Sequence, residues 1–349
     1  MLRLIIRRLF GGIVLVVLLT FTTFVAAKSI PQNKACMFVD YMTATRAEMK
    51  AALHQHGFDR PVLVQYGDYM WGIVSSQSLG FSWNGIKLDA IIGASLPATA
   101  SLVAGGMVLT LLLALPLGAL AALRPRSFID RTFLAGSVVG LAVHPFVLGI
   151  GLASFFHALG APRHGYCPLT GSTIPGQAAT PGEPIPIYHS GQGPHPCGGL
   201  RDWAWHMAVP WFVFALFFIP IYLRMIRTRL VGTLSEPYIT TARAKGATEK
   251  RVVVHHALRN SMGPLLPMVA LDAGTAITAA IYVETIFGLP GLGHLAVVGL
   301  TGEIGQIHYD LPFLIALVLT IGVFVVALTT LADIAHAWLD PRIRPRVLS

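Results

Sequence analysis

Long apolar runs, separated by shorter polar stretches, dominate this chain. Six runs are long enough to cross a bilayer, because a helix needs about 20 apolar residues to span a hydrocarbon core about 30 Å thick. They are residues 9–27, 98–123, 132–158, 203–223, 260–283 and 311–332. Inside lipid every backbone amide needs a partner within the protein, and helices provide it. We therefore predict an all-α integral membrane protein with six transmembrane helices in a single domain, residues 1–349.

The composition supports this prediction. Hydrophobic residues make up 54% of the chain and charged residues only 12%, whereas soluble domains carry about 25% charged residues. So few charges cannot cover a water-facing surface, and lipid must solvate much of the protein. The formal net charge is +9. In a soluble protein that excess would suggest a nucleic-acid partner, but here we interpret it as an orientation signal and expect no nucleic acid.

Basic residues orient the six predicted helices, because short cytosolic segments are enriched in lysine and arginine. If the N-terminus is cytosolic, most of the 25 lysines and arginines fall on cytosolic segments. The inverted topology would place these residues outside and is rejected. We therefore predict that the N- and C-termini are both cytosolic.

The first apolar run also has features of a cleavable signal peptide. Arg3, Arg7 and Arg8 precede it, and residues 25–27 (Val-Ala-Ala) are weakly similar to a cleavage site. Its apolar part is longer than the usual core of a signal peptide. An uncleaved membrane anchor is therefore the favoured interpretation.

Four longer stretches lie outside the predicted spans. In the predicted topology the segments 28–97, 159–202 and 284–310 are outside, and the segment 225–263 is cytosolic. The first outer segment contains a helical pattern at Thr43–His54. The second is rich in glycine and proline, which predicts an irregular loop.

The cytosolic segment 225–263 predicts a short helix held between two turns. Ser235, as a capping residue before Glu and Pro, marks a helix start, and Gly246 suits a helix end. These signals define a helix at Tyr238–Lys245, and a second helix starts near Thr248. Such a helix suits insertion into a groove of a partner protein. Its basic residues equally suit an amphipathic helix on anionic lipid, and periodicity alone does not separate the two.

The residues of this segment resemble a known motif. Residues 238–247 (YITTARAKGA) and 256–260 (HALRN) resemble the EAA loop of ABC importer permeases. The match is closest to the dipeptide/oligopeptide/nickel permease family, in its first-permease, B-type branch. The Glu-Ala-Ala of the motif reads Thr-Thr-Ala at 240–242, so that Ala242 and Gly246 keep the general pattern.

Further likenesses to this family cover most of the chain, in the order expected for it. They lie at residues 2–9, 57–61, 65–66, 96–99, 282–287, 290–293 and 340–344. The resemblance implies a type I ABC importer permease fold in the bacterial plasma (inner) membrane and a function in peptide import. It also implies four kinds of partner: a second, C-type permease subunit, two ATP-binding subunits, a substrate-binding protein and membrane lipid.

The same resemblance assigns a role to the short cytosolic helix. It would be the coupling helix that contacts the partner ATPases. The residues implied in this coupling are Tyr238, Ala242, Arg243, Lys245, Gly246 and Ala247.

The chain itself is expected to be non-catalytic. It contains no G-x-x-x-x-G-K-[ST] phosphate loop, so ATP and magnesium would be bound by the partner ATPases, and no cofactor or metal is expected in this chain. Import of nickel or another small solute is the alternative within the same family. A stand-alone secondary transporter is a weaker alternative, because it would not need a docking loop.

Three acidic residues lie in or beside predicted spans. Asp272 is either a pathway or gating residue that meets the amino group of a substrate, or a carboxylate paired with a neighbouring helix or with the second permease, because a charge in lipid is costly. Glu284 matches the family pattern and is a candidate for closing the outer gate. Asp333 is interpreted as structural.

The three cysteines all fall on the outer side in the predicted topology, where disulfides are permitted. A bridge between Cys167 and Cys197 is favoured among the three possible pairings, which would leave Cys36 free. The two paired cysteines, with His164 and His195, loosely resemble a zinc-binding set. Their irregular spacing makes a metal site the less favoured alternative.

Overall fold

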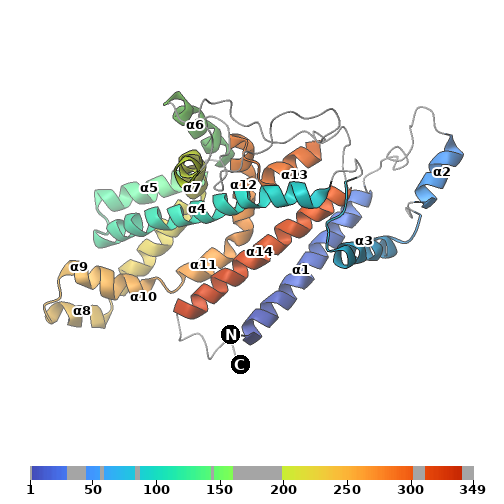
Figure 1. Cartoon of the computed structure of the whole chain (residues 1–349). Coiled ribbons are helices and arrows are strands. Elements are labelled where there is room, and N and C mark those ends of the chain that lie inside the picture. Colours follow the sequence, from blue (N-terminus) through green and yellow to red (C-terminus); the bar gives the residue numbers. More distant parts are fainter. Residues whose placement is uncertain are drawn as a thin grey trace. The chain divides into compact units, whose positions relative to one another are not determined.

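The protein is described by a computed structural model that covers residues 2–29, 45–55, 59–82, 87–142, 145–159, 199–301 and 311–339. Nearly all of these residues are helical (Figure 1). The helices are α1 Leu2–Ser29, α2 Arg46–Gln55, α3 Val62–Ser76, α4 Leu88–Leu123, α5 Phe128–Ala142, α6 Pro145–Ala158, α7 Leu200–Leu234, α8 Pro237–Ala244, α9 Glu249–Arg251, α10 Arg259–Ser261, α11 Leu265–Leu271, α12 Ala273–Phe287, α13 Leu292–Thr301 and α14 Leu311–Leu339. A π-helical segment, Val252–Leu258, joins α9 to α10.

Four of the described helices are long and apolar enough to cross a membrane. They are α1 from Ile6 onward, α4, α7 and α14 as far as Trp338. Two bent pairs, α5 with α6 and α12 with α13, bring the number of candidate spans to six if each pair is one span. The all-α membrane class is therefore confirmed. Four predicted spans fall within α1, α4, α7 and α14, the third falls on the α5–α6 pair, and the fifth overlaps the α12–α13 pair only in α12.

The predicted third and fifth spans are not single straight helices. The apolar run 132–158 divides between α5 and α6, and α6 begins at Pro145. Proline fits the first position of a helix, where its missing N–H donor would have no intrahelical partner. The run 260–283 begins in α10 and a turn, and its helical part continues beyond Val283 to Phe287.

The second and fourth spans are longer than their apolar runs. Helix α4 starts at Leu88 rather than at Ala98, so Pro97 lies inside it. Helix α7 continues from Arg224 to Leu234. The arginines at the end of the fourth apolar run therefore lie on a helix instead of in a loop.

The helices divide into two compact units. The first comprises residues 1–8, 96–294 and 325–349, and the second comprises 9–95 and 295–324.

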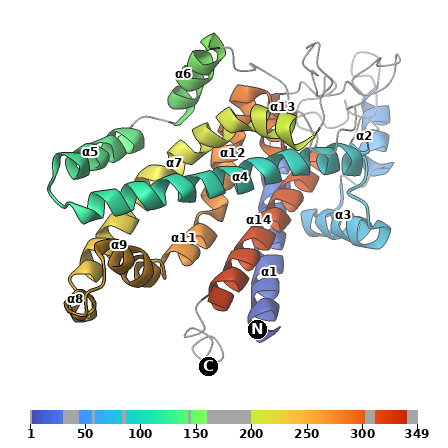
Figure 2. The same cartoon turned by 60° about the vertical axis from the view of Figure 1, so that its left-hand side comes forward.

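In the first unit, α7 packs against α5, α6 and α12, and its side chains also contact α4 (Figure 2). Two glycines of α4 allow the close approach. A Cβ at Gly105 would lie 2.3 Å from the Trp211 indole, and one at Gly106 would lie 2.3 Å from the Phe214 ring. The Trp211 indole N–H also donates to the carbonyl of Ser101 (2.9 Å). The α4–α7 crossing is therefore fixed by steric fit and by one polar contact.

The first unit also joins the start of α1 to the end of α14. Arg8 Nε lies 2.6 Å from Asp333 Oδ2. The carboxylate of Asp333 is mostly buried, whereas the arginine is half exposed. This pairing agrees with the structural interpretation of Asp333.

In the second unit, α1 and α14 run side by side (Figures 1 and 2). They approach where Gly322 faces Val16, since a Cβ on Gly322 would lie 3.1 Å from that side chain. The helix predicted near Thr43–His54 is confirmed as α2. It begins at a capping box, in which Thr45 N–H donates to Glu48 Oε2 (2.8 Å) and Glu48 N–H donates to Thr45 Oγ1 (3.3 Å).

Candidate functional site

The predicted short cytosolic helix is present as α8, shifted by one residue from Tyr238–Lys245 to Pro237–Ala244. Pro237 occupies the first helical position, as predicted. Ser235 does not cap this helix, since the N-cap is Glu236 and no side chain bonds there. The Ser235 hydroxyl instead donates to carbonyls in the last turn of α7, at 2.8 Å from Gly232 O. The serine signal therefore marks the end of α7.

The end of α8 is a Schellman motif built on Gly246. This glycine has φ +82°, in the left-handed region that glycine occupies without a Cβ clash. Its N–H donates to Arg243 O (2.9 Å), and Ala247 N–H donates to Ala242 O (3.2 Å). The chain then turns directly into α9, whose N-cap is Thr248. The predicted stop and restart are both confirmed.

The inner face of α8 rests on an apolar cluster. Ile239 is fully buried against Leu230 of α7 and Val252 of the π-helical segment, with Ala122 of α4 and Ala257 completing the cluster. Ala242 and Ala247 are partly buried at its edge. Since Leu230 lies one turn before the end of α7, the position of α8 is fixed to that end.

The outer face of α8 is exposed. Tyr238, Arg243, Lys245 and Gly246 are exposed, as are three small residues, Thr240, Thr241 and Ala244. Arg243 pairs with Glu249 of α9 (Nε to Oε1, 2.7 Å), which holds the two helices together. Four of the six implied coupling residues are therefore exposed, and we call these residues with Thr240, Thr241 and Ala244 the exposed ridge of α8. The other two, Ala242 and Ala247, lie at the edge of the apolar cluster.

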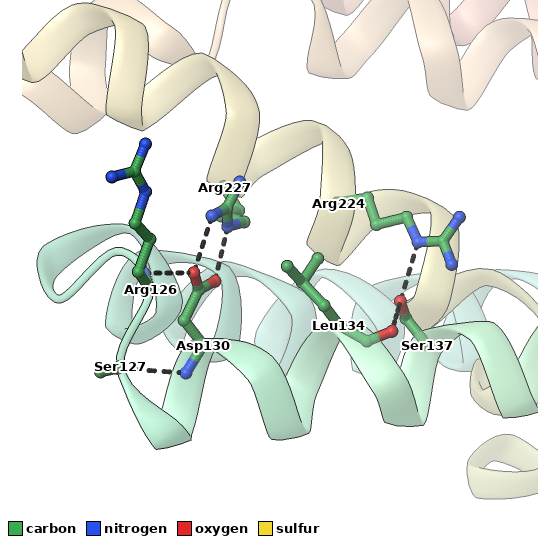
Figure 3. A network of polar contacts seen from close by, with 7 residues as sticks. All are labelled: Arg126, Ser127, Asp130, Leu134, Ser137, Arg224 and Arg227. Carbon is green, nitrogen blue, oxygen red and sulfur yellow. Dashed lines mark hydrogen bonds and ion pairs between the residues drawn. The ribbon is translucent and has the colours of Figure 1, made fainter.

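A polar network clamps α5 to α7 (Figure 3). Arg227 of α7 makes a bidentate pair with Asp130 of α5, with Nε to Oδ1 at 2.6 Å and Nη2 to Oδ2 at 2.7 Å. Asp130 is 2% exposed, so this ion pair is largely shielded from solvent on the α5 side. The backbone N–H of Arg126 also donates to Asp130 Oδ2 (2.8 Å). The turn before α5 and the helix α7 thus share one carboxylate.

A second contact extends the clamp along the same two helices. Arg224 Nε donates to Ser137 Oγ (2.8 Å), and that hydroxyl donates to Leu134 O (2.7 Å) (Figure 3). Arg224 and Arg227 are one turn apart on α7. The same helix that carries α8 at its end is therefore bound to α5 at two successive turns.

Asp272 lies at the break between α11 and α12 and is partly buried. The hydroxyl of Tyr222, a fully buried residue of α7, donates to Asp272 Oδ2 (2.8 Å). Asp272 therefore bonds to a neighbouring helix, as one of the two predicted alternatives requires, but through a hydroxyl group and not an ion pair. This contact uses one carboxylate oxygen and leaves the pathway role as a prediction.

Glu284 is fully buried at the corner between α12 and α13. Thr99 Oγ1 donates to Oε1 (2.6 Å), and the backbone N–H groups of Gly293 and His294 donate to Oε2 (2.7 and 3.0 Å). Thr99 Oγ1 also accepts from Leu292 N–H (2.8 Å). Glu284 and Thr99 together therefore satisfy the first backbone donors of α13.

Glycines make the space that Glu284 fills. A Cβ at Gly291 would lie 2.1 Å from Glu284 Cδ, and one at Gly293 would lie 2.9 Å from Oε2. The Glu284 carboxylate therefore occupies the space in which side chains at positions 291 and 293 would lie. Its place at a corner is compatible with the predicted gate role, which stays a prediction.

The sequence reasoning did not identify Asp130, Arg227 or Thr99. A signal for Asp130 was available: Ser127-x-x-Asp130 before an apolar run is a capping-box pattern, and Asp130 N–H does donate to Ser127 Oγ (3.2 Å). Thr99 lies in one of the family-like segments, residues 96–99, but nothing there assigns it a partner, since it meets Glu284 across 185 positions of sequence. The predicted Cys167–Cys197 bridge, Cys36 and the alternative metal set lie outside the described residues.

Comparison with known proteins places these features in a family. The model of the family described as "binding-protein-dependent transport system inner membrane component" matches residues 114–345, and the model of its N-terminal region matches residues 1–103. The two matches together cover the α4–α14 region and the N-terminal helices. The first of them alone spans more than half of the chain.

Similar curated proteins agree with the family models. The chain is 30% identical over 350 residues to a protein of Brucella suis named for peptide permease activity, with 99% of each chain covered. It is 29% identical to the dipeptide transport system permease protein DppB of Escherichia coli K12, again with 99% of each covered. It is also 29% identical to the oligopeptide transport system permease protein AppB of Bacillus subtilis 168, covering 97% of this chain and 98% of that protein.

The order of apolar helices, the short helix after α7 and the matched families lead to one assignment. The chain belongs to the binding-protein-dependent transport system inner membrane component family, as a multi-pass permease of the B-type branch of ABC peptide importers in the bacterial inner membrane.

Proposed function

We propose that this permease couples ATP hydrolysis by two partner ATPases to alternating access of a peptide pathway. The observation that carries the proposal is the exposed ridge of α8. Helix α8 is short, its Ile239 packs against Leu230 of α7, and a glycine in the left-handed conformation follows its end. The residues of its outer side are exposed. A rigid short helix of this kind suits a groove on a partner protein.

The clamp between α5 and α7 supports a path for the motion. Arg227 binds Asp130 at one turn of α7, and Leu230, one turn later, supports Ile239 of α8. Breaking a shielded ion pair is costly, so α5 and α7 should move together. A displacement of α8 would therefore move α5 with α7. Such a motion drives transport only if the partners contact the two states differently.

The proposed partners are a second, C-type permease, two ATP-binding subunits and a substrate-binding protein. In this arrangement ATP and magnesium are bound by the ATPases and the chain described here performs no chemistry. Both termini and the segment 225–263 are cytosolic in the proposed topology, and 28–97 and 159–202 lie outside. Peptides are the proposed substrates, in line with the names of the DppB and AppB relatives. Nickel or another small solute is the alternative within the family.

The proposed pathway residues have different roles. Asp272 is partly exposed at the break before α12, so we propose that its second oxygen faces the pathway and meets the amino group of a peptide. Asp272→Asn should then raise the KM for peptides more than it lowers kcat. Glu284 is proposed to act at the gate by fixing the α12–α13 corner rather than by touching substrate.

Co-purification from mild detergent tests the proposal. Tagged wild-type chain should bring a second permease and ATPases with it, and Gly246→Asp should lose the ATPases while keeping the permease. Gly232→Ala is a matched control, because Gly232 is also exposed and open around its Cβ position but lies inside α7. Purified chain alone should hydrolyse no ATP. Transport by the chain alone, without ATP, would overturn the proposal.

A further inference from the structure

Helix α3, Val62–Ser76, has three distinct faces in the second unit. One face packs on the α1–α14 pair through two tyrosines one turn apart. The Tyr66 hydroxyl lies 2.8 Å from Thr20 Oγ1, and the Tyr69 hydroxyl donates to Pro312 O (3.1 Å). Both rings pack against the apolar cluster of Phe24, Leu311 and Ile315. This face fixes α3 to helices that cross the membrane.

The second face of α3 is apolar and uncovered. Leu63, Trp71 and Val74 are 70%, 72% and 65% exposed, and Val64 is 44% exposed. At 3.6 residues per turn these positions fall within one continuous flank, beside the tyrosine face. Large apolar side chains at such exposure are expected to be covered in the functional protein.

The third face of α3 is polar and extends from the side opposite Tyr66 round to the other flank of the tyrosine face. Asp68 and Ser75 project from it, with Gln65 and Ser76 at its edge toward the tyrosine face. Asp68 Oδ2 lies 3.3 Å from Arg60 Nη1, and both side chains are more than half exposed. An apolar flank and a polar flank on either side of one anchored face are the pattern of a helix that lies in a membrane–water interface.

The level of α3 along α1 agrees with an interfacial position. The Tyr66 ring contacts the rings of Phe21 and Phe24 edge-on, with centroids 5.2 and 5.6 Å apart. These residues and Thr20 lie four to eight positions before Lys28, or about 6 to 12 Å along a helix rising 1.5 Å per residue. Lys28 is the first charge after the apolar run of α1, so it marks the polar boundary. The tyrosines thus reach from the boundary into the outer part of the apolar layer.

The apolar flank of α3 and the surface of α1 both expose large apolar side chains. Exposed apolar side chains follow α1 along its membrane-spanning length, and they include Ile13, Val14, Leu15, Leu18, Leu19 and Val25. In a multi-pass membrane protein, lipid is the solvent of such a surface. A soluble protein docked on the same flank would have to cover Trp71 and Leu63 but leave α1 to lipid.

We propose that α3 is an interfacial helix that lies in the bilayer surface at the Lys28 end of α1. Leu63, Trp71 and Val74 insert among the acyl chains, with Trp71 at the level where indole rings are favoured. Asp68 and Ser75 face water. The occupant of the apolar flank is therefore phospholipid, and α3 holds the N-terminal spans at a fixed depth.

Spin-label accessibility tests this placement in the full-length chain. In a background with Cys36, Cys167 and Cys197 changed to serine, single cysteines are placed at Leu63, Trp71 and Val74, with Asp68 and Ser75 as controls on the same helix. The labelled proteins are studied in nanodiscs of phosphatidylethanolamine and phosphatidylglycerol. Labels on the apolar flank should collide more with oxygen than with a water-soluble nickel chelate, and the two control labels should show the reverse. Uniform access of all five to the nickel chelate would overturn the proposal.

Two further outcomes decide between lipid and a protein partner. If the flank labels are immobile and meet neither oxygen nor the nickel chelate, a protein covers the flank and the proposal fails.

A second measurement avoids the cysteine-free background, in case that chain does not fold. The fluorescence of wild type minus that of Trp71→Phe should be quenched by phospholipids brominated near the headgroup end of the acyl chain. A difference signal quenched by aqueous iodide alone would contradict the proposal.

Discussion

Two corners of the first unit follow the end of a helix, and both use a glycine in the left-handed conformation. They differ in their exposure and in the groups that make their hydrogen bonds. Gly246, two residues after α8, has φ +82°, and Gly288, directly after α12, has φ +60°. After Gly246 the corner is exposed, and the N–H groups of Gly246 and Ala247 donate to the carbonyls of Arg243 and Ala242. After Gly288 the chain closes over the buried carboxylate of Glu284, which binds the start of α13.

The difference shows how one turn geometry serves two purposes. The α8 corner is closed by backbone bonds and by one exposed ion pair, Arg243–Glu249, so most of its outer side chains remain available for a partner. The α12 corner uses a carboxylate, a threonine and two glycines that leave no free space. Changes at the first corner should therefore affect partner binding, and changes at the second should affect folding stability.

The largest effect should come from removing the buried carboxylate. Glu284→Ala leaves the N–H groups of Gly293 and His294 and the Thr99 hydroxyl without their acceptor. At roughly 1–3 kcal/mol for each unsatisfied group, a loss of about 4 kcal/mol in the free energy of unfolding is expected. Glu284→Gln keeps one acceptor oxygen and should lose less. Thermal unfolding in detergent measures both variants, and equal stability of Ala and Gln variants would contradict the assignment.

The polar clamp of Figure 3 is a third junction, and its burial is intermediate between that of the exposed α8 corner and that of the buried α12 corner. Asp130→Asn should cost about 3 kcal/mol, because it leaves Arg227 without its charged partner in a shielded place. Arg227 is 22% exposed, which keeps the cost at the lower end of the range for buried pairs. The double variant Asp130→Asn/Arg227→Gln should cost less than the two single changes combined. Additive losses in a double-mutant cycle would show that the pair is not coupled.

Much of the first corner could be predicted from sequence, and little of the second. Pro237 and Gly246 are local signals, so the bounds of α8 were predicted to within one residue. Glu284 was selected by resemblance, but its partner Thr99 lies on another helix, and the family-like residues 96–99 do not indicate that the two side chains meet. The extension of α7 beyond Arg224 was missed because basic residues end an apolar run without ending a helix. Local signals predict helix ends, whereas tertiary contacts decide which polar groups are buried together.

Overpacking the second corner should have an intermediate effect. Gly291→Ala puts a Cβ 2.1 Å from Glu284 Cδ, so the carboxylate or the backbone must shift. A destabilisation of about 2 kcal/mol is expected. Gly274→Ala is the matched control, since Gly274 lies in α12 with open space around its Cβ position and should be neutral or stabilising. A neutral Gly291→Ala in the same unfolding assay would mean that the corner is looser than its contacts indicate.

The same substitution at the first corner should separate stability from coupling. Gly246→Ala has room for its Cβ but must hold a left-handed conformation, which costs about 1 kcal/mol. Overall thermal stability should therefore change little, whereas ATPase recovery and ATP-driven transport should fall. Gly232→Ala, one turn before α8, should change neither. Loss of global stability without loss of ATPase recovery would reverse the proposed difference between the two corners.

The smallest effect concerns a carboxylate that makes the same kind of bond as Glu284 but in water. Glu48 accepts from the Thr45 backbone N–H and hydroxyl, and these bonds hold its pKa below the usual glutamate range. A lowered pKa in the folded state means that the stabilisation is present above the usual range. It is lost as the pH falls through the lowered pKa. The first turn of α2 should then fray in acid, and hydrogen exchange of its amides, corrected for intrinsic rates, should show the loss. Glu48→Gln should show weaker protection at neutral pH and no such transition, so an identical acid response in that variant would assign the fraying to another group.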